Sequence, residues 1–271
     1  MLPSFILSLR EGLEAALVIG IVLGSLRQMQ RRDLVISTWL GAGCAALLSV
    51  AAALLLTHFG LEMKDPGEAI FEGLTELLAA AILTWMIFWM ARQSRTMKTD
   101  LEGSVRQASA GGGWSLFGLA FVAVLREGVE LALFLTAAVF ASTSTHLTLL
   151  GALLGLATAV LLGWLLFKST VRLDLRRFFQ VTGILLVVFA AGLVVRAVGE
   201  LVIAGWLPPL IDHLWDLGKV LSEDSLLGQS LGVLFGYTAS PNLVQMLAYL
   251  AYFIAVLVGL QLNRSRSLKK T

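Results

Sequence analysis

Long apolar stretches dominate the chain, and polar residues gather between them. Seven of these stretches reach the length of about 20 residues that an α-helix needs to cross the hydrocarbon core of a bilayer. Ten-residue segments of alternating polarity do not recur, so a membrane β-barrel is a poor alternative. The pattern predicts seven transmembrane helices, at residues 3–27, 34–57, 68–91, 115–140, 147–168, 178–199 and 242–262.

The composition agrees with a protein whose main solvent is lipid. Of the 271 residues, 58% are hydrophobic and only 14% are charged, whereas soluble domains carry about 25% charged residues. Cys44 is the only cysteine, which excludes a disulfide scaffold. No basic block with interleaved aromatic residues indicates a nucleic-acid surface. Arg10, Glu11 and Glu14 interrupt the first stretch, so we interpret it as part of the mature protein rather than as a signal peptide.

Charge is distributed unevenly between successive loops. Most of the twenty Lys and Arg residues lie in the first, third and fifth connections and in the C-terminal tail, whereas the other connections are mainly acidic. Cytoplasmic loops are enriched in Lys and Arg. We therefore expect a multi-pass protein of the cytoplasmic membrane, that is, the inner or plasma membrane. Its N-terminus would lie outside and its C-terminus in the cytoplasm.

One nine-residue segment occurs twice. Residues 9–17 read LREGLEAAL and residues 125–133 read LREGVELAL, identical at seven positions and offset by 116 residues. The same offset relates the second stretch to the fifth and the third to the sixth, so each half has three spans. Because three is an odd number, the two halves enter the membrane in opposite directions. Many transporters are built this way, with their sites near the bilayer midplane. We predict an all-α polytopic membrane protein with a 3+3 inverted repeat plus one C-terminal helix.

The predicted domain organisation follows this repeat. We expect the first three-helix repeat at residues 1–91, the second at 115–199, and the seventh helix with a cytoplasmic tail at 242–271. Residues 92–114 are polar and basic and end in three glycines, which predicts a flexible cytoplasmic linker. Residues 200–241 are expected to form an extracytoplasmic loop with one or two surface helices or a re-entrant piece.

Each copy of the repeated segment places one arginine and two glutamates in an apolar run. A charge at the bilayer centre costs about 3 kcal/mol even on the mildest scale, so function is the default interpretation. A structural ion pair is the alternative for one copy, but two oppositely oriented copies disfavour it. Four carboxylates with two arginines have a formal charge of −2, which favours a multivalent cation with oxygen ligands. The candidate ligands are Glu11, Glu14, Glu127 and Glu130, supported by Arg10 and Arg126 and by Gly12 and Gly128, which allow close helix approach.

Three further glutamates are candidates for an entrance to this site. Glu72 and Glu76 lie four residues apart near the expected outer end of the third stretch, where they line the entrance or simply face the headgroup water. Glu200 is expected at the outer surface and joins them as a possible entrance residue. No nucleotide-binding loop, nucleophile elbow or zinc-type cysteine pattern is present. We therefore expect a protein that is not an enzyme.

The two Arg-Glu-Gly-x-Glu elements resemble those of the oxidase-dependent iron permeases, the family of fungal high-affinity iron permeases and bacterial EfeU-type iron transporters. The resemblance extends to the LTWMIFWM run at 83–90 and the FGY run at 235–237. It implies uptake of ferric or ferrous iron, with iron as the transported substrate and no resident cofactor. The iron-handling carboxylates would be Glu11, Glu14, Glu127 and Glu130. The implied partner is an extracytoplasmic oxidase or iron-delivery protein.

One position departs from the family pattern. Many members have His-Glu at the end of the sixth span, where this chain has Gly199-Glu200. If that histidine takes part in metal handling, its contribution is missing here. Three alternatives stay open: a permease for lead or manganese, a proton-coupled exporter that uses the same carboxylates as a relay, and a membrane subunit that docks an oxidase through residues 200–241.

Overall fold

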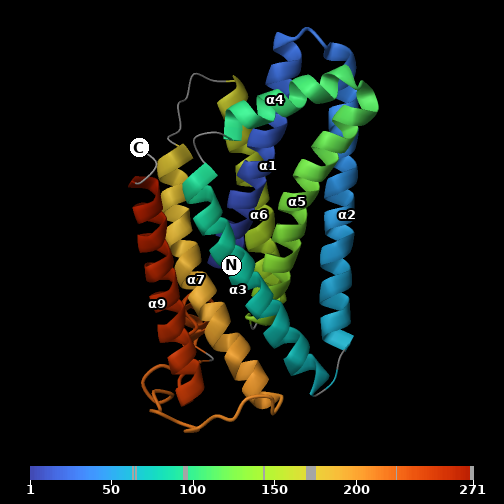
Figure 1. Ribbon diagram of the computed structural model, residues 1–271. Helices are drawn as coiled ribbons and strands as arrows, with labels where there is room; N and C mark the ends of the chain where they lie inside the picture. Colours follow the sequence, from blue (N-terminus) through green and yellow to red (C-terminus); the bar gives the residue numbers. More distant parts are fainter. Residues whose placement is uncertain are drawn as a thin grey trace. The chain divides into compact units, whose positions relative to one another are not determined.

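The computed structural model describes residues 1–62, 64, 66–93, 97–142, 144–168, 175–223 and 225–268. Within these residues the secondary structure is helical and contains no strand (Figure 1). The longer helices have 24 to 29 residues: α1 (Leu2–Gln28), α2 (Val35–Glu62), α3 (Gly67–Gln93), α5 (Gly113–Phe140), α6 (Thr145–Lys168), α7 (Leu175–Ile203) and α9 (Leu243–Leu268). The shorter ones are the 3₁₀ helix η1 (Arg32–Leu34), α4 (Met97–Ala110) and α8 (Leu226–Phe235).

The predicted apolar stretches fall on the longer helices. By length and composition, five segments of the described chain could cross a membrane: Arg32–Gly60, Gly67–Trp89, Thr145–Leu166, Val181–Ile203 and Leu243–Leu262. α1 and α5 are as long, but each carries three charged residues of the repeated segment within its apolar run. The helical architecture is therefore that of a membrane protein, while the count of seven spans and the inverted repeat stay predictions.

The chain divides into two compact units. The first consists of Met1–Thr57, Gln93–Leu135 and His146–Phe179, and contains α1, α4, α6 and most of α2 and α5. The second consists of His58–Arg92, Thr136–Thr145 and Gln180–Thr271, and contains α8, α9 and most of α3 and α7. These units are not the two predicted sequence repeats. Each combines helices from both repeats, and α1 shares its unit with α5, the helix to which the repeat relates it.

Small residues bring helices of the first unit close together. Gly151 and Gly155 of α6 lie against the first turns of α1, where an added Cβ atom would meet the carbonyl oxygens of Met1 and Phe5. Gly41 of α2 lies in the same way against the backbone of α5. Glycine allows such approach because it has no side chain between the two backbones.

Residues 97–110 form a packed helix, α4, which corrects the expectation of a flexible linker. α4 contacts α1 and crosses its C-terminal end (Figure 1). Its Val105 and Ala108 are three residues apart and therefore share one face. That face is buried in an apolar cluster beneath α4, made of Val22, Leu26, Leu34, Val105, Ala108 and Leu116. The expectation failed because so short an apolar face is hidden in a segment that is polar on average.

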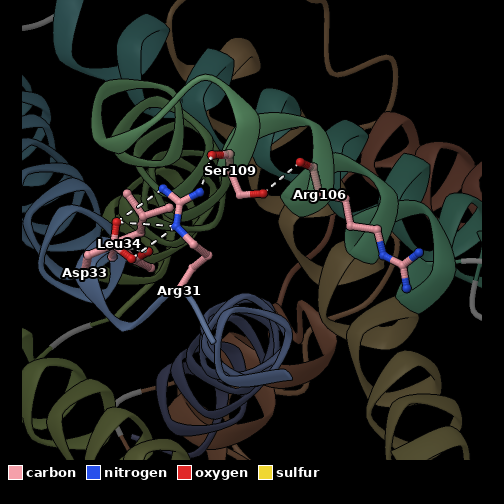
Figure 2. Close-up of polar contacts among 6 residues, drawn as sticks. Arg31, Asp33, Leu34, Arg106 and Ser109 are labelled. Carbon is pink, nitrogen blue, oxygen red and sulfur yellow. Dashed lines mark hydrogen bonds and ion pairs between the residues drawn. The ribbon is translucent and has the colours of Figure 1, made fainter. Parts of the chain in front are cut away.

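Polar contacts also hold the last turn of α4 (Figure 2). Arg31, in the turn after α1, lies 3.1 Å from Asp33 through its Nε atom and donates from Nη1 to the carbonyl oxygen of Ser109 at 3.4 Å. Gly112 follows α4 with φ of 81°, a conformation that favours glycine. Gly111 and Gly112 therefore form a tight turn between α4 and α5, and Gly113 begins α5.

In the second unit, residues 200–241 contain α8. Ser225 caps its N-terminus, because its Oγ atom accepts a hydrogen bond from the backbone N–H of Gly228 at 2.9 Å. Gly236 ends the helix with φ of 70°. α7 continues to Ile203, beyond the predicted end of the sixth span, so that Glu200 belongs to this helix.

Candidate metal site

The charged triplet of α1 is fully buried. Arg10, Glu11 and Glu14 expose 1%, 1% and 4% of their surface. Arg10 reaches both glutamates, with Nη1 at 3.2 Å from Glu11 Oε1 and Nη2 at 3.2 Å from Glu14 Oε1. One guanidinium therefore holds two carboxylates, and the triplet keeps a formal charge of −1.

The charged triplet of α5 repeats this chemistry in a more open setting. Glu127 and Glu130 are buried, but the side chain of Arg126 is 38% exposed. Arg126 Nε donates to Glu130 Oε1 at 3.2 Å and lies 3.9 Å from Glu127 Oε1. Arg126 is therefore paired chiefly with Glu130, which leaves Glu127 the less compensated carboxylate.

Three of the predicted carboxylates converge. Each of Glu11, Glu14 and Glu127 offers one oxygen, and these oxygens lie within 4.8 Å of one another. Glu130 is not part of this group, although it is close enough to Glu14 for an electrostatic interaction. The structure thus brings together three of the four predicted ligands. The fourth, Glu130, is ion-paired with Arg126. We call these three residues the carboxylate cluster.

Several oxygens at the cluster have no hydrogen-bond donor in the described part of the chain. They are Oε2 of Glu11, Glu127 and Glu130, and Oε1 of Glu14, which lies 3.2 Å from Arg10 Nη2 in an ion pair. A buried, unsatisfied polar atom costs about 1–3 kcal/mol, and more when it is charged. Native proteins rarely tolerate such atoms without a ligand, water or ion. The three carboxylate oxygens that lie within 4.8 Å of one another are donors of the kind that a hard cation prefers.

The glycine inside each motif lies at a helix contact. A Cβ atom on Gly12 would be 2.7 Å from the Cβ of Ala159 on α6. A Cβ atom on Gly128 would overlap the hydroxyl of Ser49 on α2 and lie 2.6 Å from its Cβ atom. Larger side chains would push α6 away from α1 and α2 away from α5. Both glycines thus permit the close packing next to the carboxylates that their position in the sequence suggests.

The predicted entrance residues lie in the second unit. Glu76 is completely buried, and its Oε1 accepts a hydrogen bond from Arg196 Nε at 3.2 Å. Arg196 also donates from Nη2 to the carbonyl oxygen of Phe140 at 3.1 Å. Glu72 and Glu200 are half-buried and interact electrostatically with each other. The pairing of Arg196 with Glu76 was not predicted. The sequence does place a positive charge in the sixth span and a negative charge in the third, which could have suggested this ion pair.

The position that departs from the family pattern is closely packed. A Cβ atom on Gly199 would lie 2.5 Å from Nε2 of Gln245 on α9. Gln245 donates from this atom to the carbonyl oxygen of Val195 at 3.3 Å, and its Oε1 accepts from the backbone N–H of Asn242 at 3.0 Å. The space beside Gly199 is therefore occupied by the side chain of Gln245, whose amide nitrogen and oxygen both form hydrogen bonds.

Comparisons with known proteins agree with the two motifs. The Iron permease FTR1 family matches residues 1–266. The ferrous iron permease EfeU of Shigella sonnei strain Ss046 is 37% identical over 265 residues, covering 97% of this chain and 96% of the relative. EfeU of Yersinia pestis is 35% identical over 261 residues, covering 95% and 92%. No solved structure matches the chain.

These matches confirm the resemblance that the repeated motif indicated, and they extend over both motifs and nearly the whole chain. The matched family is one of permeases. With its apolar helices, the protein is a multi-pass membrane protein of iron transport, and the chain belongs to the Iron permease FTR1 family.

Proposed function

We propose that this protein imports ferrous iron across the cytoplasmic membrane and binds it at Glu11, Glu14 and Glu127, with Glu130 as a fourth acidic group. The observation that carries the proposal is the convergence of three buried carboxylate oxygens, within 4.8 Å of one another, from two helices. Oxygen donors suit hard cations, and iron is the substrate that the family's name gives. The cluster binds a substrate and performs no chemical step.

The charge of the site favours the ferrous form. Four carboxylates against Arg10 and Arg126 leave a formal charge of −2, which one divalent cation neutralises. A ferric ion would leave a net positive charge in a buried site, which is costly. The relatives from Shigella and Yersinia are named ferrous iron permeases. Manganese and lead meet the same oxygen donors, so we expect them to compete, since geometry and availability rather than affinity order select the metal.

We further propose that Glu72, Glu76 and Glu200 form an acidic entrance on the outer side. Their charge would raise the local concentration of cations, as acidic clefts do. Arg196 holds Glu76 and limits how strongly this region retains a cation. An extracytoplasmic oxidase or iron-delivery protein would release iron here, with the N-terminus of the permease outside and the C-terminus in the cytoplasm.

The proposal is tested by uptake of radioactive iron into cells that lack other iron importers. Iron is supplied either as ferrous ion with ascorbate or as ferric citrate, with manganese and lead as competitors. We expect wild-type protein to import ferrous iron, and Glu127→Gln to abolish import because the amide removes one charged ligand. Glu102→Gln, on α4 and outside the cluster, is the matched control and should retain import.

The outcomes separate the alternatives. Uptake of ferric iron alone would overturn the ferrous assignment, and normal uptake by Glu127→Gln would overturn the site. Lower iron accumulation in cells with the protein than without it would indicate the proton-coupled exporter. Immunoblotting of membranes checks that each variant is present at the wild-type level.

A further inference from the structure

Ser8 has an unusual hydroxyl group. The residue lies on α1, is completely buried, and its Oγ atom has no hydrogen-bond partner in the described part of the chain. A hydroxyl can donate one hydrogen bond and accept two. Leaving it unsatisfied in a buried position costs about 1–3 kcal/mol. Such a group calls for a specific explanation.

Other buried hydroxyls in the same unit satisfy themselves locally. Ser4 donates to the carbonyl oxygen of Met1 at 2.8 Å, Thr38 to that of Leu34 at 3.3 Å, and Ser49 to that of Ala45 at 2.9 Å. This bond to the preceding turn is the usual solution for serine and threonine inside a helix. Ser4 is the closest comparison, because it lies one turn before Ser8 on α1 and is equally buried.

The position of Ser8 connects its hydroxyl with the carboxylate cluster. Ser8 precedes Glu11 by three residues, so both side chains lie on one face of α1 in adjacent turns. Across from Ser8, α6 presents Gly155, whose added Cβ atom would be 2.9 Å from the Cβ atom of Ser8. Glycine offers no polar side chain to this hydroxyl. The polar side chains one turn away on α1 are those of Ser4, whose hydroxyl is already bonded to Met1, and of Glu11, whose Oε2 also has no donor in the described part of the chain.

We propose that Ser8 is a specificity-determining ligand residue, whose hydroxyl supplies a neutral oxygen to the divalent cation held by the carboxylate cluster. This inference rests on the function proposed above and extends its ligand set beyond the two repeated motifs. Hard divalent cations of this size take about six oxygen ligands. Three carboxylates that each offer one oxygen leave part of that shell open, and a further charged ligand would add to the repulsion among them. A neutral hydroxyl adds a ligand without adding charge.

Two substitutions test the role of Ser8, each with a matched control at Ser4. Ser8→Ala removes the oxygen, and Ser8→Cys replaces it with sulfur, which prefers softer cations. Binding of Mn²⁺ and of Cd²⁺ to the purified full-length protein is measured by titration calorimetry. Uptake of ferrous iron is measured in cells, with Cd²⁺ as competitor. Ser4→Ala and Ser4→Cys make the same chemical changes one turn away, at a hydroxyl that is already satisfied.

We expect Ser8→Ala to weaken Mn²⁺ binding and to raise the KM for ferrous iron by about fivefold, the loss that corresponds to one modest polar contact. Ser8→Cys should raise the preference for Cd²⁺ over Mn²⁺ by about tenfold, since a thiol at the ligand position changes which metal binds. Both Ser4 variants should behave as wild type. A shift in metal preference cannot arise from a packing defect alone.

Two results would overturn the proposal. If wild type binds Mn²⁺ and Ser8→Cys leaves the metal preference unchanged, Ser8 is not a ligand, although the carboxylate site stands. If wild type binds no divalent cation, the function proposed for the cluster fails, and the role of Ser8 fails with it. An equal shift in Ser4→Cys would likewise reject an assignment to Ser8 in particular.

Discussion

Arg10 and Arg126 occupy equivalent places in the two motifs but have different surroundings. Arg10 is 1% exposed and contacts two buried glutamates at 3.2 Å each. The side chain of Arg126 is 38% exposed, and its Nε atom lies 3.2 Å from Glu130 and 3.9 Å from Glu127. Removing one partner of a buried ion pair leaves an uncompensated charge, whereas an exposed group is compensated by solvent. The two arginines should therefore contribute unequally to stability.

Replacing each arginine by glutamine tests this difference. We expect Arg10→Gln to lower the stability of the detergent-solubilised protein by about 3–5 kcal/mol, the usual cost of breaking a buried pair. Arg126→Gln should cost clearly less. Thermal unfolding followed by circular dichroism, with iron absent, measures both variants against wild type. Equal losses would show that the burial of Arg10 does not govern its contribution.

The sequence singles out the buried charged residues that the structure brings together, but not their geometry. Charges within apolar runs are conspicuous, which is why the cluster residues and their arginines could be named in advance. The pairing of Arg126 with Glu130 follows from their spacing of four residues on a helix. Which carboxylates converge with those of α1 depends on helix packing and side-chain rotamers, which spacing does not provide. The unsatisfied hydroxyl of Ser8 could not be foreseen, because serine inside an apolar helix normally bonds to its own backbone.

At the scale of elements, helix packing in the first unit depends on where glycine replaces a larger residue. Gly12 and Gly24 both lie on α1, but only Gly12 faces a close neighbour, Ala159 of α6. Around the Cα atom of Gly24, an added Cβ atom would meet nothing within 4 Å. The same substitution should therefore have opposite effects at the two positions.

We expect Gly12→Ala to destabilise the protein by about 1–3 kcal/mol, since overpacking forces helices apart. Gly24→Ala should be neutral or stabilising by up to about 1 kcal/mol, because alanine favours the helix. The melting temperatures of both variants and of wild type, measured in the same detergent, test this difference. A drop in Gly24→Ala as large as that in Gly12→Ala would contradict the packing described here.

The elements themselves are predicted to different degrees. Long apolar stretches predict the long helices, because a bilayer requires about 20 residues for each crossing. α4 is not predicted, since its apolar face consists of Val105 and Ala108 within a polar segment. The extension of α7 to Ile203 is also missed, because the predicted span ends at residue 199, where the helix is already long enough to cross the hydrocarbon core.

On the scale of the whole molecule, the way the chain crosses the membrane depends on α1 and α5. If both cross, the chain has seven spans, the N-terminus lies outside and the C-terminus in the cytoplasm. If only the five segments without charged triplets cross, both termini change sides. Basic residues in alternate connections favour the first arrangement.

Tags at the two ends distinguish these arrangements. We expect an N-terminal epitope to be accessible to antibody in intact spheroplasts, and a C-terminal green fluorescent protein to fluoresce in the cytoplasm. A cytoplasmic N-terminus with a non-fluorescent C-terminal fusion would support the five-span arrangement. Ferrous iron uptake by each fusion confirms that the tagged protein is functional.

The apolar cluster beneath α4 has a consequence for how membrane voltage acts on the substrate. Val22 and Leu26 of α1 and Leu116 of α5 lie between the carboxylates and the ends of these helices near α4. Packed hydrocarbon polarises weakly, so part of a transmembrane voltage falls across it. Each elementary charge that crosses gains about 2.3 kcal/mol per 100 mV, or about 5 kcal/mol for a divalent ion. In the orientation we propose, an interior-negative membrane therefore drives the ion inward, from the outer side to the cytoplasm.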